Sequence, residues 1–490
     1  MKAVFENLRP YDRACAEKYK MPGEILMENA ARGLYEYIKV YVKKHFKKKP
    51  TLAILCGSGD NGADGLALAR MISDLVNVRV VQLAEPKSEL CILQSERLKL
   101  LGFKVQNEIG DCDILLDAFL GTGFRGDLRE NAVTIIEQIN ALKAFKIACD
   151  VPSGINEKGL PSPVAVKADV TLSAGALKLC LYSDVAKDYV GKIKTITLGL
   201  ASEKYAKHED AFAFLLEKND MKLPFRKLKN CHKGMFGHAC IYAGKKEGAA
   251  ILAGLACLKF GAGLVTLCGN KPTFVPPDLM YADKANKDFS TYCLGPGLAD
   301  KAEDYVNSFL LHTSGKNKQN NTINTNVVFD ADALKTKSLA ENLSRFTNCI
   351  ISPHPKEFVE LLKNVYITKS FTPDSIKGLK SIEDISPSFV QENRFTFAKI
   401  FSKSFPNIAL VLKGANTIIS YGEKMYISTA GSASLAKAGS GDVLAGMLTA
   451  LLAQGYNILD ACITACLAHG FASQSLCSYG STASDLISKI

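Results

Sequence analysis

Residues 436–452 have the sequence A-K-A-G-S-G-D-V-L-A-G-M-L-T-A-L-L, which decides the fold of the second half of the chain. Small residues and glycines lead to Asp442, and leucines then recur at helical spacing, so the stretch predicts a loop that opens a helix. The first N–H groups of such a helix attract anions, and we expect the backbone of Gly439, Ser440 and Gly441 to bind a phosphate group. Asp442 would then either take a proton from an attacking hydroxyl group or only favour the helix dipole.

The length and composition of the chain indicate a protein of two globular domains. Its 490 residues exceed what one hydrophobic core usually organises, and 47% hydrophobic with 22% charged residues is typical of globular proteins. The 15 cysteines contain no pair at Cys-x-x-Cys spacing, so we expect reduced thiols and a cytoplasmic location. The net charge of +11 suits anionic small substrates, and we expect no nucleic-acid partner.

The longest uncharged run extends from Val443 to Leu459. Two glycines, Gln454 and Asn457 interrupt its apolar character, and its length is at the short limit for crossing a bilayer. We therefore expect a buried core helix here and no membrane partner.

The first half of the chain alternates predicted strands and helices. Thr51–Cys56 is apolar and predicts a buried parallel strand, followed by the loop G-S-G-D-N-G-A-D-G, residues 57–65, and a helix from Leu66. Further strands are predicted at residues 78–83, 113–119, 146–151, 169–173 and 192–197. This alternation predicts a doubly wound, mostly parallel sheet, whose ligands bind at the carboxyl ends of the strands.

Three polar loops are expected at those strand ends: residues 57–65, 117–127 and 150–154. The first loop contains the G-x-G-x-x-G pattern of dinucleotide binding, but its acids Asp60 and Asp64 would repel a pyrophosphate. Together with Asn61, these acids indicate either oxygen ligands for a cation or hydrogen bonds to ribose hydroxyl groups.

The loop sequences G-S-G-D-N-G-A-D-G, D-A-F-L-G-T-G-F-R-G and D-V-P-S-G, in this order, resemble the NAD(P)H-hydrate epimerase family. The resemblance implies a Rossmann-like domain over residues 1–210, with Asp150 at the reacting centre and K⁺ bound by Asn61, Asp117 and Ser153. It also implies that the hydrated dinucleotide contacts Asp60, Asn61, Gly62, Ala63, Asp64, Gly121, Thr122, Gly123, Phe124, Arg125, Gly126 and Asp127. Asp60 and Ala63 depart from the usual pattern G-x-G-N-N-G-G-D-G.

The second half of the chain begins a new alternating pattern, with a strand at 238–243, a helix at 249–260 and a strand at 263–268. Two acids end the predicted strand V-V-F-D-A-D, residues 327–332, and prolines hold His354 in a rigid loop. Lys413 follows another apolar strand and is a plausible phosphate ligand.

The motifs H-K-G-x-x-G, G-P-G-L, P-H-P, K-G-A-x-T and A-G-S-G-D occur in this order over residues 215–490. These motifs and their order resemble those of the ADP- or ATP-dependent NAD(P)H-hydrate dehydratases of the ribokinase-like superfamily. The resemblance implies that the hydrated dinucleotide meets Ala249, Gly297, His354 and the catalytic Asp442. It implies that ADP or ATP, with Mg²⁺, is held by Lys413, Gly414, Ala415, Asn416, Thr417, Ser432, Gly439, Ser440 and Gly441. Lys356 stands where a glycine is usual in P-H-P-G-E.

We therefore expect a bifunctional metabolite-repair enzyme that epimerises hydrated NADH or NADPH and dehydrates the S epimer with an adenine nucleotide. We expect it to form a homo-oligomer. One alternative is a ribokinase-like small-molecule kinase, for example of a vitamin alcohol, with a non-catalytic binding domain at its N-terminus. In another, the first domain is only a dimerising scaffold.

Overall fold

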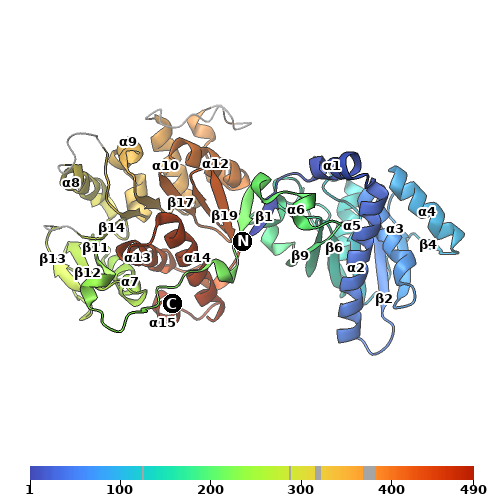
Figure 1. Ribbon diagram of the computed structural model, residues 1–490, viewed down its shortest axis with the longest axis horizontal. Coiled ribbons are helices and arrows are strands. Elements are labelled where there is room, and N and C mark those ends of the chain that lie inside the picture. Colours follow the sequence, from blue (N-terminus) through green and yellow to red (C-terminus); the bar gives the residue numbers. More distant parts are fainter. Residues whose placement is uncertain (124–125, 286–288, 315–321, 368–378, 380) are drawn as a thin grey trace. The chain divides into compact units, whose positions relative to one another are not determined.

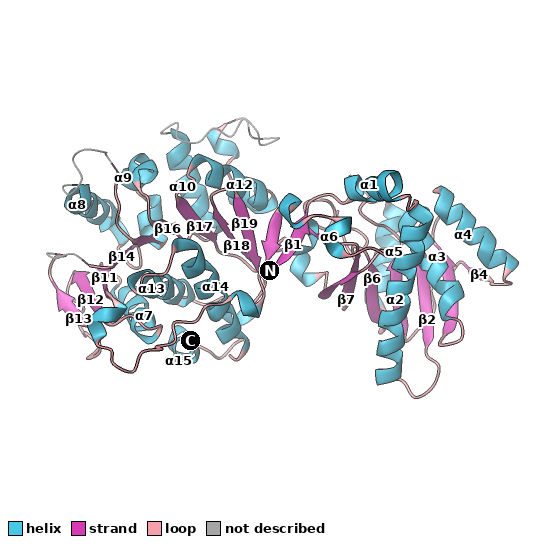
Figure 2. Cartoon of the chain, viewed as in Figure 1, coloured by secondary structure: helices cyan, strands magenta, loops and turns pink. Residues whose placement is uncertain are grey.

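The structure is a computed structural model and describes residues 1–123, 126–285, 289–314, 322–367, 379 and 381–490 (Figure 1). These residues form two compact units, Lys2–Ala213 and Phe214–Ile490, and Met1 belongs to the second. Both units are α/β (Figure 2), with sheets whose strand order reverses at a switch point, so the predicted doubly wound class is confirmed. Phe124 and Arg125, predicted to bind substrate, lie outside the described residues.

The first unit contains a parallel sheet with the strand order β4, β3, β2, β5, β6, β7, β9. The strands are β2 (Thr51–Cys56), β3 (Asn77–Gln82), β4 (Val105–Gln106), β5 (Ile114–Ala118), β6 (Phe145–Cys149), β7 (Val170–Ala174) and β9 (Lys192–Ile196). A short strand β1 (Lys2–Phe5) pairs in parallel with β8 (Leu177–Lys178). The chain runs outward from β2 to β4 and then returns to β5, so the switch point lies between β2 and β5.

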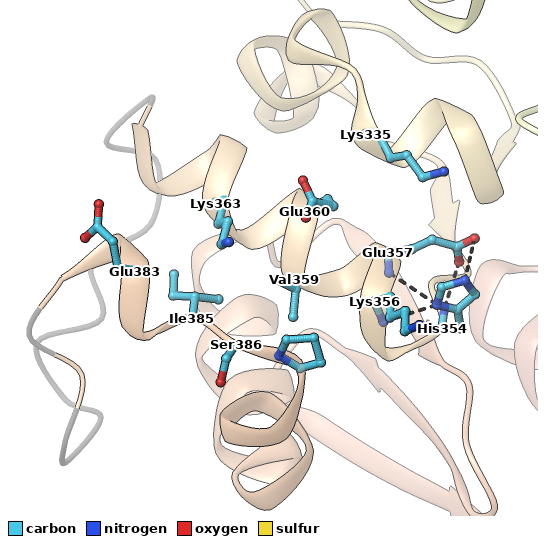
Figure 3. Close-up of a pocket in the computed structure, with 11 residues that line it drawn as sticks. Lys335, His354, Lys356, Glu357, Val359, Glu360, Lys363, Glu383, Ile385 and Ser386 are labelled. Carbon is cyan, nitrogen blue, oxygen red and sulfur yellow. Dashed lines mark hydrogen bonds and ion pairs between the residues drawn. The ribbon is translucent and has the colours of Figure 1, made fainter. Parts of the chain in front are cut away.

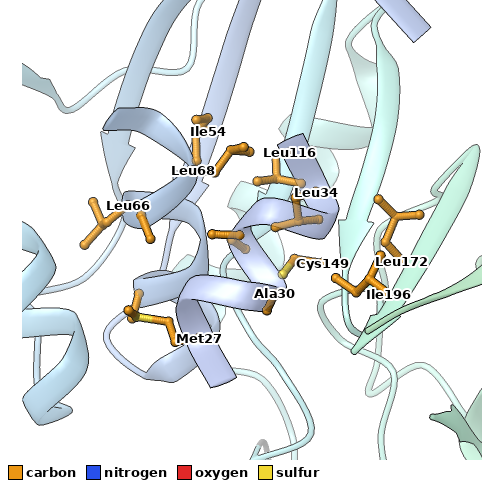
Figure 4. Packing of buried hydrophobic residues seen from close by; sticks show 14 of the residues in the cluster. Met27, Ala30, Leu34, Ile54, Leu66, Leu68, Leu116, Cys149, Leu172 and Ile196 are labelled. Atoms are coloured by element: carbon orange, nitrogen blue, oxygen red, sulfur yellow. The ribbon is translucent and has the colours of Figure 1, made fainter. Parts of the chain in front are cut away.

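The helices of the first unit are α1 (Arg9–Tyr19), α2 (Gly23–His45), α3 (Asp60–Ile72), α4 (Glu89–Leu100), α5 (Glu130–Ala141) and α6 (Ser202–Tyr205). Side chains alternate along β2, so its two faces join different cores. Ile54 packs with Leu34 of α2 on one face (Figure 4), whereas Leu55 packs with Ile136 of α5 on the other. Burial on both faces explains why these strands are continuously apolar in sequence.

Helix α3 begins at Asp60, so the predicted start at Leu66 was wrong. Glycines permit the earlier start, because a Cβ atom on Gly62 would lie 2.2 Å from the carbonyl oxygen of Gly57. A Cβ atom on Gly65 would likewise lie 3.0 Å from the Cβ of Ala118 in β5. The second half of the glycine loop is therefore a helix packed closely onto the ends of the strands.

The second unit contains a sheet with the order β13, β12, β11, β14, β15, β16, β17, β18, β19, β10. Its strands are β11 (His238–Ala243), β12 (Leu264–Gly269), β13 (Met280–Ala282), β14 (Thr291–Leu294), β15 (Val327–Phe329), β16 (Cys349–Ile351), β17 (Ile408–Leu412), β18 (Thr417–Tyr421), β19 (Lys424–Ser428) and β10 (Ala213–Leu215). Strands β17, β18 and β19 pair antiparallel, and the other pairs are parallel. The switch point lies between β11 and β14.

Helices cover both faces of this sheet. They are α7 (Glu247–Lys259), α8 (Ala302–Ser314), α9 (Lys337–Asn342), α10 (Pro355–Ile367), α11 (Pro387–Glu392), α12 (Arg394–Ser404), α13 (Ser440–Ala453), α14 (Ile458–Gln474) and α15 (Ala483–Lys489). On β14, the ring of Tyr292 packs against Phe309 of α8, whereas Cys293 faces Thr449 of α13 on the opposite side.

Helix α13 is the central helix of the second unit. Every residue from Val443 to Ala453 is buried, and the helix lies against α7, α14, β14 and β15. The uncharged run from Val443 to Leu459 is not one helix as predicted, because Gly455 adopts φ +84° and the chain turns before α14. Within the described residues, no helix is both long and apolar enough to cross a membrane.

Candidate active sites

The first candidate site lies at the carboxyl ends of β2, β5 and β6, beside the switch point. A Cβ atom on Gly57 would lie 1.8 Å from the carbonyl oxygen of Phe119, so the first two loops touch each other. Gly62 and Ala63 are buried in the first turn of α3. These two residues therefore position the loop rather than present side chains to a ligand.

A buried hydrogen-bond network joins the second loop to the third. The carboxylate of Asp117 accepts hydrogen bonds from the amide of Ser153 at 2.8 Å and from its hydroxyl group at 2.5 Å. The Oγ of Ser153 accepts a bond from the amide of Leu120 at 2.8 Å. Asn61 donates to the carbonyl oxygen of Leu120 at 3.0 Å. The three residues predicted to bind K⁺ therefore gather around Leu120.

Two features of this network fit a bound cation. The Oδ1 atom of Asn61 is buried and has no hydrogen-bond partner among the described residues, which is costly for an amide oxygen. Burial raises the pKa of Asp117 to about 6, although hydrogen bonds from Ser153 and Phe119 oppose the shift. A monovalent cation would satisfy the amide oxygen and stabilise the ionised carboxylate. The residues present thus fit K⁺.

Asp150 follows β6 directly and has φ +69°, a left-handed conformation that aspartate tolerates better than most residues. Its Oδ1 atom accepts a hydrogen bond from the amide of Ala174 at 2.9 Å. The same atom accepts a bond from the Nζ of Lys178 at 2.5 Å. The carboxylate is therefore held from one side by β7 and β8.

Other acids lie near Asp150. Burial, followed by the charges of Asp150 and Asp60, raises the pKa of Asp64 well above its ordinary value. Burial also raises the pKa of Asp12, which a hydrogen bond of 2.7 Å from the hydroxyl group of Tyr205 opposes. Asp64 therefore keeps its proton to higher pH than an ordinary carboxyl group. Asp60 is exposed at the start of α3.

The structure describes the second loop, residues 117–127, except for residues 124 and 125. A Cβ atom on Gly121 would lie 3.2 Å from the Cβ of Asn61, so this end of the loop reaches the first loop. The other described residues predicted to bind substrate here are exposed: Thr122, Gly123, Gly126 and Asp127.

The second candidate site lies at the carboxyl ends of β15, β16 and β17. Asp330 is buried after β15, and its Oδ1 atom accepts a hydrogen bond from Lys413 at 2.7 Å. The hydroxyl group of Ser352 donates to the same oxygen at 2.9 Å. The Nζ of Lys413 also lies 3.7 Å from the carboxylate of Glu357. Lys413 is thus the centre of a buried charged cluster.

His354 has a defined tautomer in this cluster. Its Nδ1 atom accepts hydrogen bonds from the amides of Lys356 at 3.1 Å and Glu357 at 3.2 Å, so the ring proton is on Nε2. Nε2 lies 3.1 Å from the Oε1 of Glu357. Burial, followed by the charge of Lys413, lowers the pKa of His354. The neutral ring therefore stands at the edge of the site as a hydrogen-bond donor.

Asp442 lies in the first turn of α13. Burial and then the nearby charge of Asp330 raise its pKa to about 7, and Lys413 partly opposes the shift. A Cβ atom on Gly441 would lie 3.3 Å from the Nζ of Lys413. The structure therefore brings together a cation, a helix N-terminus and a carboxyl group that titrates near neutral pH.

The conformation of Gly439 and a contact with α14 define the start of α13. Gly439 has φ +90°, and a Cβ atom there would lie 2.8 Å from both Ala483 and Leu252. The hydroxyl group of Ser440 bonds to backbone carbonyl groups before the helix, and its own carbonyl oxygen lies 3.0 Å from the Nε2 of His469. The backbone N–H of Ser440 donates to the carbonyl oxygen of Lys437 at 3.4 Å, whereas the N–H groups of Gly439 and Gly441 lie at the start of the helix, where a ligand can accept from them.

The remaining predicted residues fall into two groups. A Cβ atom on Gly297 would lie 3.2 Å from the Cβ of Ala249, so these two residues meet at the switch point. Ser432 hydrogen-bonds to Ser473 of α14. The other residues predicted to bind the nucleotide before α13 follow directly after β17. Besides Lys413, they are the exposed Gly414 and Ala415, the buried Asn416, and Thr417, which starts β18.

An open cleft of about 520 Å³ extends from the second site along α10 (Figure 3). His354 and Glu357 stand at one end, and Glu383 and Ile385 lie across from the helix. The cleft is lined by Lys335, His354, Lys356, Glu357, Val359, Glu360, Lys363, Glu383, Ile385, Ser386 and Pro387. Lys356, which departs from the usual motif, therefore faces this cleft.

Sequence reasoning did not name several residues of these two sites. Lys178 and Tyr205 lie in segments with no recognisable motif, and no signal in the sequence marks them. Asp330 and Glu357 do lie in stretches that the sequence singled out, the acids after a strand and the proline-bounded loop. Their pairing with Lys413 could not be predicted, because it depends on β15, β16 and β17 being neighbours in the sheet.

Comparison with known proteins finds two matching families. The family described as "YjeF-related protein N-terminus" matches residues 23–180, and the one described as "NAD(P)H-hydrate dehydratase" matches residues 239–490. A Helicobacter pylori protein named "Bifunctional NAD(P)H-hydrate repair enzyme Nnr" is 38% identical over 502 residues, covering 100% of this chain and 99% of that protein. Proteins of the same name from Archaeoglobus fulgidus and Escherichia coli are 28% and 30% identical. They cover 99% and 89% of this chain and 96% and 84% of their own lengths.

Proposed function

Because this chain belongs to the bifunctional NAD(P)H-hydrate repair enzymes, we propose that each of its two activities resides in one unit. Residues 1–210 carry the epimerase, which interconverts the R and S forms of hydrated NADH or NADPH. Residues 215–490 carry the dehydratase, which uses an adenine nucleotide to return the S form to the reduced cofactor. The enzyme thereby repairs both epimers of a damaged cofactor.

One observation carries the assignment of the second site: Asp442 and Lys413 meet at the N-terminus of α13. The backbone N–H groups of Gly439 and Gly441 and the ammonium group of Lys413 bind the nucleotide phosphates, and Ser440 lies between the two glycines. Asp442 takes the proton from the hydroxyl group on the hydrated ring. The oxygen of that hydroxyl group at the same time attacks the terminal phosphoryl group of the nucleotide. A poor leaving group thereby becomes a phosphate.

Elimination completes the dehydration. The C–O bond breaks with the electron pair leaving on phosphate, the ring nitrogen supports the positive charge, and a proton leaves the neighbouring carbon. NAD(P)H, phosphate and the nucleoside diphosphate or monophosphate are then released. His354 stands at the edge of this site as a neutral ring whose Nε2 lies 3.1 Å from the Oε1 of Glu357, and its half-exposed ring contacts the substrate.

Mg²⁺ would enter the second site together with the nucleotide. In the described part of the chain, no group of three or more His, Cys, Asp or Glu side chains is arranged to hold a metal ion. Mg²⁺ usually keeps several waters and binds through phosphates and one or two carboxylates, so such a group is not needed. The ion would neutralise phosphate charge during the transfer.

In the first site, Asp150 acts as the catalytic base, and Asn61, Asp117 and Ser153 hold K⁺. The unpartnered Oδ1 of Asn61 and the raised pKa of Asp117 support this cation site. K⁺ would supply fixed positive charge close to the phosphates or hydroxyl groups of the substrate. Asp64, which keeps its proton to higher pH than an ordinary carboxyl group, is the second acid of this site beside Asp150.

The small-molecule kinase is not favoured as an alternative. Relatives named as repair enzymes match this chain over both units, whereas a kinase with an unrelated binding domain would match in the second unit alone.

Two full-length variants test the division of activities. Asp150→Asn should dehydrate the S epimer at the rate of the unchanged enzyme but consume the R epimer only at its spontaneous rate. Asp442→Asn should interconvert the epimers and form no NAD(P)H. If either variant lost both activities while folded, the two sites would not be separate.

A further inference from the structure

Lys178 is a buried lysine whose hydrogen-bonding capacity is used up within the protein. It is 6% exposed and lies at the end of β8. Its Nζ atom donates to Asp150 at 2.5 Å, to the carbonyl oxygen of Ala174 at 3.1 Å and to the Oγ of Ser173 at 3.2 Å. An ammonium group has three N–H donors, so none remains for a substrate.

The two carboxylate oxygens of Asp150 differ in the hydrogen bonds that they accept. Oδ1 accepts both the bond from Lys178 and the bond from the amide of Ala174. Within the described residues, Oδ2 accepts no hydrogen bond, and the side chain is 14% exposed. One oxygen is therefore anchored, and the other remains available to a ligand.

The surroundings of Asp150 are otherwise acidic or neutral. The titratable groups that interact with it from the neighbouring elements are Asp12 of α1, Asp64 of α3, Cys149 of β6, Cys180 after β8 and Tyr205 of α6. Asp60, also of α3, adds its charge to Asp12 and Asp64. Lys178 is the cation that pairs with Asp150 in the described part of the chain. Removing a single partner from a buried ion pair leaves an uncompensated charge, which is strongly unfavourable.

We propose that Lys178 is the positioning residue of the epimerase site: it fixes Oδ1 of Asp150, so that Oδ2 faces the substrate. Lys178 acts through Asp150 and does not touch the substrate. The proposal rests on the proposed role of Asp150 as the base. It explains why a lysine is buried among acids beside a strained backbone position.

The test compares Lys178→Met, Lys178→Arg and the exposed-lysine control Lys192→Met in the full-length protein with K⁺. Lys178→Met should lower kcat for epimerisation roughly 10- to 100-fold with little change in KM, since general base catalysis is weakened but binding is not. Lys178→Arg should restore part of kcat, and Lys192→Met should leave it unchanged.

Dehydration of the S epimer reports in each variant whether the second unit is intact, and the KM for epimerisation reports whether the first unit still binds its substrate. Should Lys178→Met fail to fold, Ser173→Ala removes one acceptor of the ammonium group, and a fall in kcat without a change in KM would support the proposal. The proposal is overturned by an unchanged kcat, by a rise in KM alone, or by a loss of kcat that arginine does not restore in part. Absence of epimerisation in the unchanged enzyme would instead refute the proposed function, and Asp150→Asn would then have no effect.

Discussion

Asp442 shows how a single side chain acquires its chemistry from its surroundings. Burial in the first turn of α13, with Asp330 and Glu357 nearby, raises its pKa to about 7. A carboxylate of ordinary pKa would be a weak base at neutral pH, whereas this one is close to the optimum for proton transfer.

We expect kcat/KM for dehydration to rise with pH around pH 7, because Asp442 must be ionised to accept a proton and its pKa is about 7. The measurement is the rate of NADH formation from the S epimer between pH 5 and pH 9 at low substrate concentration. A rate that stayed constant down to pH 5 would contradict the role of Asp442 as base.

The same shift predicts how stability changes with pH. The folded protein holds the proton of Asp442 more tightly than the unfolded chain, whose carboxyl group has a pKa near 3.8. This contribution to the free energy of unfolding is therefore lost as pH rises from about 4 through about 7. Asp442→Asn, neutral at every pH, should unfold at higher urea concentration than the unchanged protein at pH 8.

The buried amide oxygen of Asn61 is one of the atoms that we propose bind K⁺. We expect epimerisation to fall at least about tenfold when K⁺ is replaced by tetramethylammonium, since loss of a cation or its ligand commonly has such an effect. Asn61→Ala should raise the K⁺ concentration needed for half-maximal activity, with dehydration as the internal control. Equal epimerisation with and without K⁺ would show that this network binds no functional cation.

Individual residues were predictable where the chain places them in a motif. Asp150 opens the proline-containing loop 150–154, Asp442 follows a glycine-rich stretch, and both were named from the sequence. The partners of Lys413 were not named, because Asp330 is 83 residues away and meets it only through the order of the strands. Lys178 is surrounded in sequence by residues with no distinguishing pattern.

At the scale of elements, the predicted strands of both units agree closely with the structure. Buried parallel strands are continuously apolar, which makes them easy to recognise from sequence. Helix boundaries were less predictable, as α3 shows: its glycines suggested a loop, yet they serve close packing in its first turns. A pattern of glycines does not distinguish a flexible loop from a tightly packed helix start.

The start of α13 gives a prediction with a matched control. Gly439→Ala would combine a φ of +90° with contacts of 2.8 Å to Ala483 and Leu252, whereas Gly455→Ala would combine a φ of +84° with open space. Gly455→Ala should cost about 1 kcal/mol of unfolding free energy, and Gly439→Ala about 2 to 4 kcal/mol. Urea denaturation measures both values.

A measurement of nucleotide binding should also distinguish Gly439→Ala from Gly455→Ala. Gly439→Ala moves the N–H groups that we assign to the phosphates, so it should also weaken nucleotide binding, and Gly455→Ala should not. Equal unfolding free energies for the two variants would show that the close contacts at Gly439 relax without cost.

At the scale of the molecule, the two units explain why one chain carries two activities. The dehydratase accepts the S epimer, so R molecules would accumulate without a neighbouring epimerase. The two-domain organisation could be expected from length and from two alternating patterns, and the structure divides the chain between Ala213 and Phe214.

The most direct test follows the near-ultraviolet absorbance of NADH after the purified full-length protein is mixed with an R and S mixture of hydrated NADH, K⁺, Mg²⁺ and either ATP or ADP. We predict a nucleotide-dependent rise that continues until both epimers are consumed. A rise that stopped once the S epimer was exhausted would contradict the epimerase role of the first unit, and no rise with either nucleotide would contradict the repair function.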